Sequence, residues 1–295
     1  MPGTRVMWAE FKEKTYESYF LAELARLTTI LYSPDQTDEG VLGFDGSFML
    51  PLPIARFAFP YMRYRRWRRL IGISATEIDN IGAKLNSLLP QFRLNLFVQY
   101  KRPEWLHRSN STEWSSWGNP YFRYTIEAKQ QGLLENISQV ACGRAAVVYA
   151  AAAFKLKSEL FTHAAVGTVV QNSNISSVDM LNGHDRFTYT MPGSYGIAHS
   201  EPEAIEGPSL DAILARMQDN DGLPFTEHLK LTAESIDRAI KDDREARNLW
   251  KASRSAILGG EDAKVSPLGR ETWVEAIISI VAFAQAFDVR VSAAG

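Results

Sequence analysis

Apolar side chains in the N-terminal segment recur with the period of a helix. Within residues 8–31 they are spaced by three or four positions, at Tyr16, Phe20, Leu24, Leu27 and Leu31. This spacing places them on one face of a helix. A Tyr-Ser-Pro-Asp sequence follows and breaks the pattern. The segment therefore predicts an amphipathic helix.

Two apolar segments further along the chain predict strands that carry polar residues. Residues 41–50 read VLGFDGSFML and place Asp45 in a Gly-Phe-Asp-Gly turn. Residues 92–103 read FRLNLFVQYKRP, an apolar run that ends with Gln99 and Lys101. Because side chains alternate along a strand, these two side chains share one face, and those of their neighbours take the other.

Beyond this strand the pattern changes between helix and strand. Residues 126–141 predict a helix, residues 144–154 a buried strand, and residues 185–199 a hairpin. From about residue 209 onward the pattern is helical. The last stretch, residues 273–289, is apolar but contains Glu275 and is short for a membrane span. We expect it to form a buried or partner-facing helix.

Composition places the chain among ordinary soluble globular proteins. It has 295 residues, 45% of them hydrophobic, and a formal net charge of −2, which gives no global reason to expect a nucleic-acid partner. Cys142 is the single cysteine, so an intramolecular disulfide and a cysteine-based zinc site are excluded. The N-terminus lacks the apolar core of a signal peptide. We expect a cytoplasmic protein that does not enter a membrane.

Local charge differs from the global balance in residues 54–90, which separate the two polar strands. Tyr61, Tyr64 and Trp67 lie among the arginines of this segment, and a capping box beginning at Ser74 predicts a helix after them. The arginines could bind phosphates while the rings stack on bases. Equally, the rings could pack inward beneath a solvated basic face. The arginines concerned are Arg63, Arg65, Arg66, Arg68 and Arg69.

Four polar residues suggest a metal site suited to phosphodiester hydrolysis. Mg²⁺ or Mn²⁺ takes oxygen ligands, which the Asp45 carboxylate and the Gln99 amide would supply. Lys101 would lie near the attacking water or the phosphate. Glu17, on the first helix, would complete the pocket, and Glu13 lies one turn earlier on the same face.

Each part of this set also has a simpler structural interpretation. Gly-x-Asp-Gly is a common turn, and Gln-x-Lys at a strand end is usually a solvated strand face. Gln130 and Gln131, near the start of the helix at 126–141, could line the active site, but they are most simply an exposed helix face. The combination, in this order along the chain, is more specific than its parts.

The order of these residues resembles the Mrr-like branch of the restriction-endonuclease-like superfamily, PD-(D/E)xK. The likeness rests on Gly43-Phe44-Asp45-Gly46, on Phe97-Val98-Gln99-Tyr100-Lys101-Arg102, and on Glu17 in the first helix. In that branch Gln replaces an acidic residue of the last motif. The resemblance covers roughly residues 8–160. The gap from Asp45 to Gln99 is longer than the family's hairpin, and Asp38 and Glu39 are alternative carboxylates.

The resemblance implies an α/β (α+β) fold with a four-stranded mixed sheet flanked by helices. It also implies an Mg-dependent endonuclease that cleaves DNA, with a role in restriction or defence against foreign DNA in a prokaryote. In this interpretation Asp45 and Gln99 bind the metal, Lys101 and Glu17 assist catalysis, and Arg102 joins the five arginines in binding nucleic acid. RNA is not excluded as a substrate.

The predicted organisation is a nuclease-like core at residues 1–204, with the insert at 54–90, followed by a helical C-terminal region at 205–295. The C-terminal helices suggest a surface for a homo-oligomer or a partner protein. A second hypothesis keeps the fold without the chemistry, as a non-catalytic nucleic-acid-binding or assembly subunit.

Overall fold

The computed structural model describes residues 7–27, 75–141, 143–258 and 272–294. Secondary structure in these ranges is mixed, with helices and two β-sheets, as the sequence predicts at the level of fold class. The finer assignment, a restriction-endonuclease-like core, stays a prediction. No helix within the described ranges is long and apolar enough to cross a membrane.

Two compact units alternate along the chain. Unit 1 comprises Met1–Leu27, Val98–Ser138 and Ala146–Arg216, and unit 2 comprises the remaining segments, Thr28–Phe97, Gln139–Ala145 and Met217–Gly295. This division is interleaved, whereas the sequence predicts two consecutive regions that meet at residues 204 and 205.

Helices occur in both units. They are α1 (Glu13–Leu27), α3 (Ala75–Leu88), α4 (Trp114–Trp117), α5 (Ala128–Val140), α6 (Lys157–Val166), α7 (Leu210–Ala215), α8 (Phe225–Ala239), α9 (Arg244–Leu258) and α10 (Trp273–Phe287). Two short 3₁₀ helices, η1 (Val178–Met180) and η2 (Arg216–Asp219), complete the described set. The helices predicted near residues 74–90 and 126–141 are confirmed as α3 and α5.

The first helix begins later than its pattern predicts. Residues Met7–Trp8 form strand β1, which pairs antiparallel with Glu104–Leu106, strand β3. The Ala9 N–H continues this contact by donating to the Pro103 carbonyl at 3.0 Å. Backbone pairing therefore occupies the residues before Lys12, and the helix starts only at Glu13.

One sheet has four strands in the order β10-β2-β5-β6. Its members are β10 (Arg290–Ala294), β2 (Leu94–Lys101), β5 (Ala145–Ala152) and β6 (Ser173–Ser177). Strands β5 and β6 are antiparallel. The predicted strands β2 and β5 are confirmed. The all-helical prediction for the C-terminal region is wrong at its end, because β10 is a strand of this sheet.

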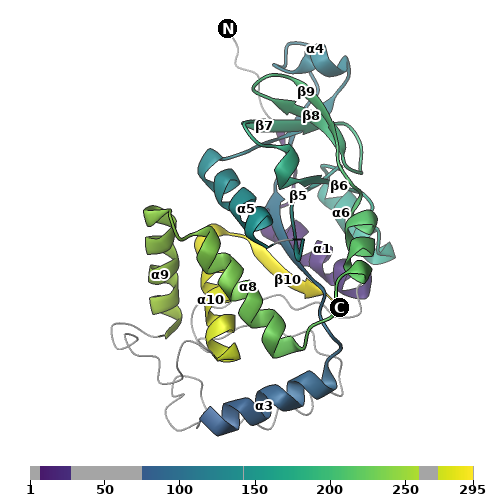
Figure 1. Ribbon diagram of the computed structural model, residues 1–295. Helices are drawn as coiled ribbons and strands as arrows, with labels where there is room; N and C mark the ends of the chain where they lie inside the picture. Colours follow the sequence, from purple (N-terminus) through teal and green to yellow (C-terminus); the bar gives the residue numbers. More distant parts are fainter. Residues whose placement is uncertain (1–6, 28–74, 142, 259–271, 295) are drawn as a thin grey trace. The chain divides into compact units, whose positions relative to one another are not determined.

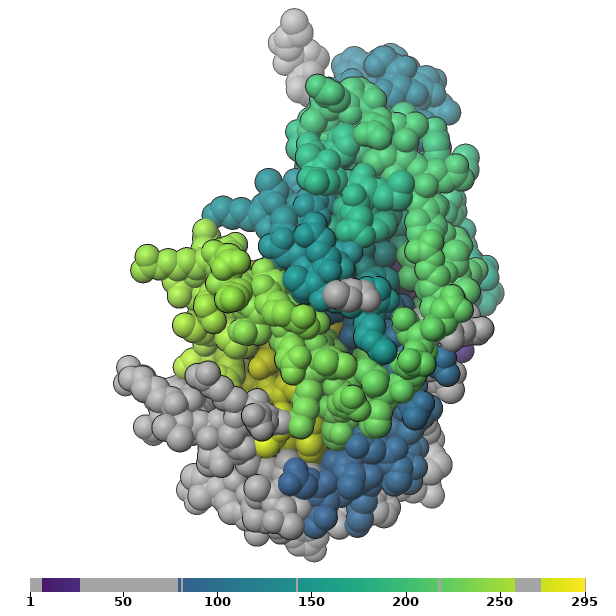
Figure 2. Space-filling model, viewed as in Figure 1, coloured from purple at the N-terminus to yellow at the C-terminus, as the bar shows by residue number. Residues whose placement is uncertain are grey.

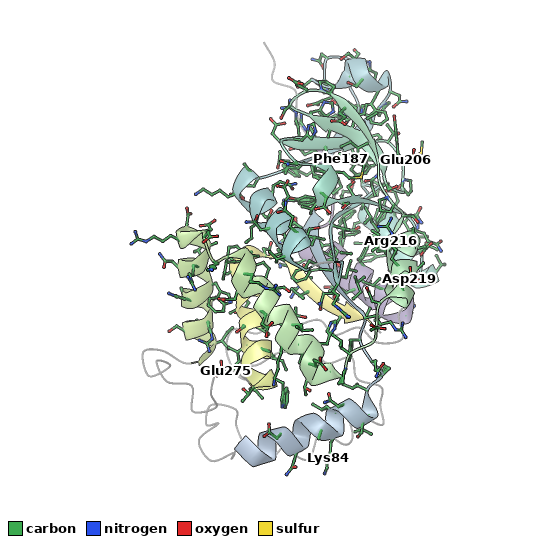
Figure 3. The ribbon with its side chains drawn as sticks, in the orientation of Figure 1. Lys84, Phe187, Glu206, Arg216, Asp219 and Glu275 are labelled. Atoms are coloured by element: carbon green, nitrogen blue, oxygen red, sulfur yellow. The ribbon has the colours of Figure 1, made fainter. Side chains whose placement is uncertain are left out.

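The other sheet has six strands in the order β1-β3-β4-β7-β8-β9, and every neighbouring pair is antiparallel. Its remaining members are β4 (Tyr121–Thr125), β7 (Arg186–Tyr189), β8 (Tyr195–His199) and β9 (Glu203–Glu206). Strands β7 and β8 confirm the predicted hairpin. One face is aromatic, and Phe187, labelled in Figure 3, packs there against Tyr124 and Tyr189.

The apolar helix α10 forms the centre of unit 2. Figure 1 shows α8 and α9 beside it, and in Figure 2 a small part of the yellow segment, which comprises α10 and β10, is visible on this face. Its apolar positions are buried, from Val274 to Ala284. Glu275, labelled in Figure 3, is also buried and forms an ion pair with Arg254 of α9. The expectation of a buried final helix is confirmed, so its apolar side chains are used within the chain.

Candidate active site

Strand β2 places Gln99 and Lys101 on one side and Tyr100 on the other. Tyr100 packs edge-on against Tyr16 and Phe20 of α1, with ring centroids 5.8 and 5.4 Å away. Gln99 and Lys101 instead contact α5, as described below. The alternation predicted from the sequence is therefore confirmed, and α1 covers the strand face opposite to the Gln-x-Lys pair.

A glutamine of α5 joins the two residues of the pair. The Gln130 amide nitrogen donates to Gln99 Oε1 at 2.7 Å, and Lys101 Nζ donates to Gln130 Oε1 at 3.1 Å. Gln99 is buried, while Lys101 and Gln130 are half-buried. One amide thus fixes both side chains at the end of β2.

The ammonium of Lys101 sets the direction of this hydrogen-bond chain. A lysine only donates, so Gln130 must turn its oxygen toward Lys101 and its NH₂ group toward Gln99. Gln99 must then present its oxygen to Gln130, and its own NH₂ group donates to the Tyr100 carbonyl at 3.3 Å. The Gln99 oxygen, which has two lone pairs, is the atom that a hard cation would bind.

The neighbouring glutamine of α5 fixes the aromatic ring beside Lys101. Lys101 Nζ lies 5.3 Å from the centroid of Tyr149, whose hydroxyl donates to Gln131 Oε1 at 2.9 Å. The Gln131 NH₂ group in turn donates to Glu135 Oε1 and to the Val178 carbonyl. Burial, helped by Glu135 and Glu127, raises the pKa of Tyr149, so its phenol stays a donor. Gln130 and Gln131 are therefore inward-facing, and the prediction of an exposed helix face is wrong.

Glu17 is a buried carboxylate on α1, 4% exposed, with Lys14 Nζ 3.6 Å from its Oε2. Its helix neighbours Tyr16 and Phe20 pack on the Tyr100 side of β2. Glu13, the alternative carboxylate, is half-buried. The predicted role of Glu17 beside Gln99 and Lys101 stays a prediction.

The remaining ligand assignments fall outside the described residues. Asp45, its alternatives Asp38 and Glu39, and the predicted strand at 41–50 all belong to the range 28–74, as do Arg63, Arg65, Arg66, Arg68 and Arg69. The described neighbours of β2 in the sheet, β10 and β5, both come from later in the chain. Among residues with described positions, no three His, Cys, Asp or Glu side chains gather as a metal-binding group.

Arg102, the sixth predicted nucleic-acid contact, follows Lys101 directly and is half-buried. Its Nε and Nη2 atoms donate to the Ala9 carbonyl, and its Cζ lies 5.8 Å from the centroid of the Trp8 ring. Part of this guanidinium therefore holds the segment between β1 and α1.

A second polar cluster, which the sequence did not reveal, lies on the six-stranded sheet. Arg123 contacts Glu104 Oε2, with Nε at 2.8 Å and Nη2 at 2.6 Å, and contacts Glu113 Oε2 through Nη1 at 3.2 Å. Arg186 Nε lies 3.0 Å from Glu113 Oε1, and Tyr121 donates to Glu113 Oε2 at 2.8 Å. Burial, together with the Glu113 hydrogen bond, raises the pKa of Tyr121 to about 12. Asp185 Oδ1 also lies 3.6 Å from Arg186 Nε, so carboxylates and guanidinium groups pair with each other throughout this ion cluster.

Comparisons with known proteins give no match: no family model, no curated protein and no solved structure matches the chain significantly. The likeness to PD-(D/E)xK nucleases therefore rests on the sequence of this chain and stays a prediction.

Proposed function

We propose that the protein is a metal-dependent nuclease that hydrolyses DNA phosphodiester bonds, in restriction or defence against foreign DNA. The observation that carries this proposal is the chain of hydrogen bonds from half-buried Lys101 through half-buried Gln130 to buried Gln99. It holds a neutral oxygen and an ammonium group at the end of one strand. That pair suits an ion-bound phosphate, because the ligand and the cation are positioned before the substrate arrives.

In this proposal Asp45 and Gln99 hold Mg²⁺ or Mn²⁺, and Glu17 assists. When bound, such an ion lowers the pKa of a coordinated water and offsets charge on the phosphate. Lys101 donates to a phosphate oxygen or to the attacking water, and the Tyr149 ring beside it restricts where the ammonium can lie. Water attacks phosphorus, one P–O ester bond breaks, and the leaving oxygen takes up a proton.

The direct test is cleavage of plasmid and linear DNA with Mg²⁺ or Mn²⁺ by the full chain and by the variants Asp45→Ala and Lys101→Ala. Each variant should lose activity by on the order of a hundredfold or more. Lys251→Ala, on an exposed position of α9, is the matched control and should cleave normally. Normal cleavage by both site variants would overturn the assignment. Parallel assays on RNA decide between the two nucleic acids.

A second function, a non-catalytic nucleic-acid-binding or assembly module, is favoured by one feature of the same chain of hydrogen bonds. The Gln130 amide already engages the Gln99 oxygen and the Lys101 ammonium, as in a purely structural link between β2 and α5. Salt-sensitive DNA binding with no cleavage under either metal, unchanged in Asp45→Ala, would support this module.

A further inference from the structure

The segment before α1 carries an exposed aromatic ring at the end of β2. Trp8 is 50% exposed, although it pairs with Glu104 in the backbone register of β1 and β3. Met7, whose side chain points to the other face of the sheet, is also exposed. Half of the surface of the Trp8 side chain therefore faces solvent at the β1 edge of the six-stranded sheet.

Trp105, which pairs with Met7 in the β1–β3 register, is an example of a tryptophan that packs within the protein. Trp105 packs on Phe122, with centroids 4.6 Å apart, and Lys155 Nζ lies 4.3 Å from its ring centroid. The Trp105 ring therefore has two protein neighbours, an aromatic ring and a cation. Trp8 has the cation, Arg102, and keeps half of its surface in solvent.

Arg102 brings positive charge to the exposed ring. Of its five N–H donors, Nε–H and one on Nη2 donate to the Ala9 carbonyl, and the other three have no acceptor among the residues that the structure describes. Within the described ranges Arg102 forms no ion pair with a carboxylate. The nearby Glu10 carboxylate accepts instead from the Lys157 backbone N–H at 3.1 Å. The Trp8–Arg102 pair therefore offers a stacking surface beside a cation with spare donors.

The position of this pair relates it to the candidate active site within unit 1. Arg102 is the residue after Lys101, so the two side chains leave the end of β2 toward opposite sides. Lys101 lies on the α5 side, with Gln130, and Arg102 lies with Trp8 beside the segment that enters α1. The two cations are consecutive in the sequence, so Lys101 and the Trp8–Arg102 pair both lie at the end of β2.

We propose that Trp8 and Arg102 bind an unpaired nucleotide of the substrate strand, Trp8 by stacking on the base and Arg102 by contacting its phosphate. The ring is flat and exposed, which suits any base, and the guanidinium fork fits a phosphate. A base inside a duplex is stacked on its neighbours, so the surface selects single-stranded or locally opened DNA. This inference rests on the proposed nuclease function for the identity of the substrate, while its test requires no cleavage.

The experiment measures binding of the full chain to a fluorescent single-stranded thymidine oligonucleotide by anisotropy, in EDTA. A strand of abasic sites of the same length presents phosphates without bases. Trp8→Leu should weaken thymidine-strand binding at least about fivefold and leave abasic-strand binding unchanged. Trp8→Phe, which keeps an aromatic ring, should restore most of the affinity.

Tyr195→Leu is the matched control, because Tyr195 is another exposed aromatic of unit 1, at 39%. Its thymidine-strand affinity should equal that of the wild type. The proposal is overturned if Trp8→Leu binds the thymidine strand normally, if it loses abasic-strand binding equally, or if Trp8→Phe fails to rescue. Metal-dependent cleavage is scored separately, so loss of the nuclease assignment leaves the binding result interpretable, and the reverse also holds.

Discussion

The two polar clusters of unit 1 differ in the kinds of groups that they join. In the ion cluster, the carboxylates of Glu104 and Glu113 pair directly with the guanidinium groups of Arg123 and Arg186. In the chain of hydrogen bonds at β2, an ammonium and two neutral amides are joined instead. Carboxylate–guanidinium pairs stabilise each other within the protein, whereas an amide oxygen held near a lysine ammonium is a combination that suits a bound ion and a phosphate.

The two clusters also differ in how many of their acceptor oxygens are used in described hydrogen bonds. Both oxygens of Glu113 accept hydrogen bonds, Oε2 from Tyr121 and Arg123 and Oε1 from Arg123, and Oε1 also forms an ion pair with Arg186. Such a carboxylate ties the segment around α4 to strands β4 and β7. The Gln99 oxygen accepts one described hydrogen bond and has a second lone pair. We infer that the ion cluster stabilises the fold and that the Gln99–Gln130–Lys101 chain serves the site.

The largest expected effect comes from breaking the ion cluster. Glu113→Ala leaves two guanidinium groups and the Tyr121 hydroxyl without their shared carboxylate, which should cost about 3–5 kcal/mol of unfolding free energy. Urea unfolding followed by circular dichroism measures this loss. Glu206→Ala, on an exposed position of β9 labelled in Figure 3, is the control and should change stability little. A Glu113 variant as stable as that control would show that the cluster is not structural.

The opposite result is expected at Gln130, where activity should fall and stability should change little. Gln130→Leu removes the amide that orients Gln99 and Lys101, and loss of such a supporting contact typically lowers metal affinity or activity about 10–100-fold. The measurement is the rate of DNA cleavage at several Mg²⁺ concentrations, compared with Gln139→Leu on the exposed side of α5. Equal rates in the two variants would assign Gln130 to a merely structural link.

The main elements of the site followed from sequence periodicity, but their polar contacts did not. Strand β2, helix α5 and strand β5 occur where the pattern predicts, since each repeats its apolar period over many residues. The inward orientation of Gln130 and Gln131 was not predicted, because the periodicity argument assigns polar residues to the solvent-facing side of a helix. Here they face polar partners on β2 and β5, and only the sheet reveals those partners.

The strand β10 and the ion cluster escaped prediction for a related reason. β10 has five residues after a strongly apolar helix, and its neighbour in the sheet, β2, already ends at Lys101, far earlier in the chain than Arg290. Glu104 and Arg123 are directly opposite in the β3–β4 register, but the sequence between them gives no clue to that register. Both features depend on which strands pair and in which register, and this information cannot be read from the local pattern of a single sequence.

A smaller effect should follow from removing one hydroxyl beside the site. Tyr149→Phe keeps the ring beside Lys101 but leaves the buried Gln131 oxygen without its donor, which should cost about 1–3 kcal/mol. Cleavage per folded molecule should stay near that of the wild type, because the ring contact with Lys101 is retained. Thermal unfolding and cleavage assays on the same preparation separate the two quantities. A large loss of cleavage at unchanged stability would place the Tyr149 hydroxyl in the chemistry.

The smallest effect concerns pH and the histidine beside the ion cluster. His199 Nε2 lies 2.8 Å from the Thr188 hydroxyl, and burial is the main cause that lowers the pKa of His199, with Arg186 also lowering it. Because the unfolded chain binds this proton more readily, stability from neutral His199 is present above about pH 6.5 and is lost as pH falls below it. His199→Gln should therefore flatten the acid side of the stability profile.

His228 titrates in the same window and sets the background for that measurement. Burial, and to a lesser extent Arg144, lowers the pKa of His228 to about 4, so it also destabilises the fold as pH falls from 6.5. The informative quantity is the difference in unfolding free energy between wild type and His199→Gln at each pH, with His228 common to both. That difference should change by less than about 1 kcal/mol per pH unit, and only below pH 6.5. A difference that stays constant with pH would show that His199 keeps its ordinary pKa and lies outside the electrostatics of the ion cluster.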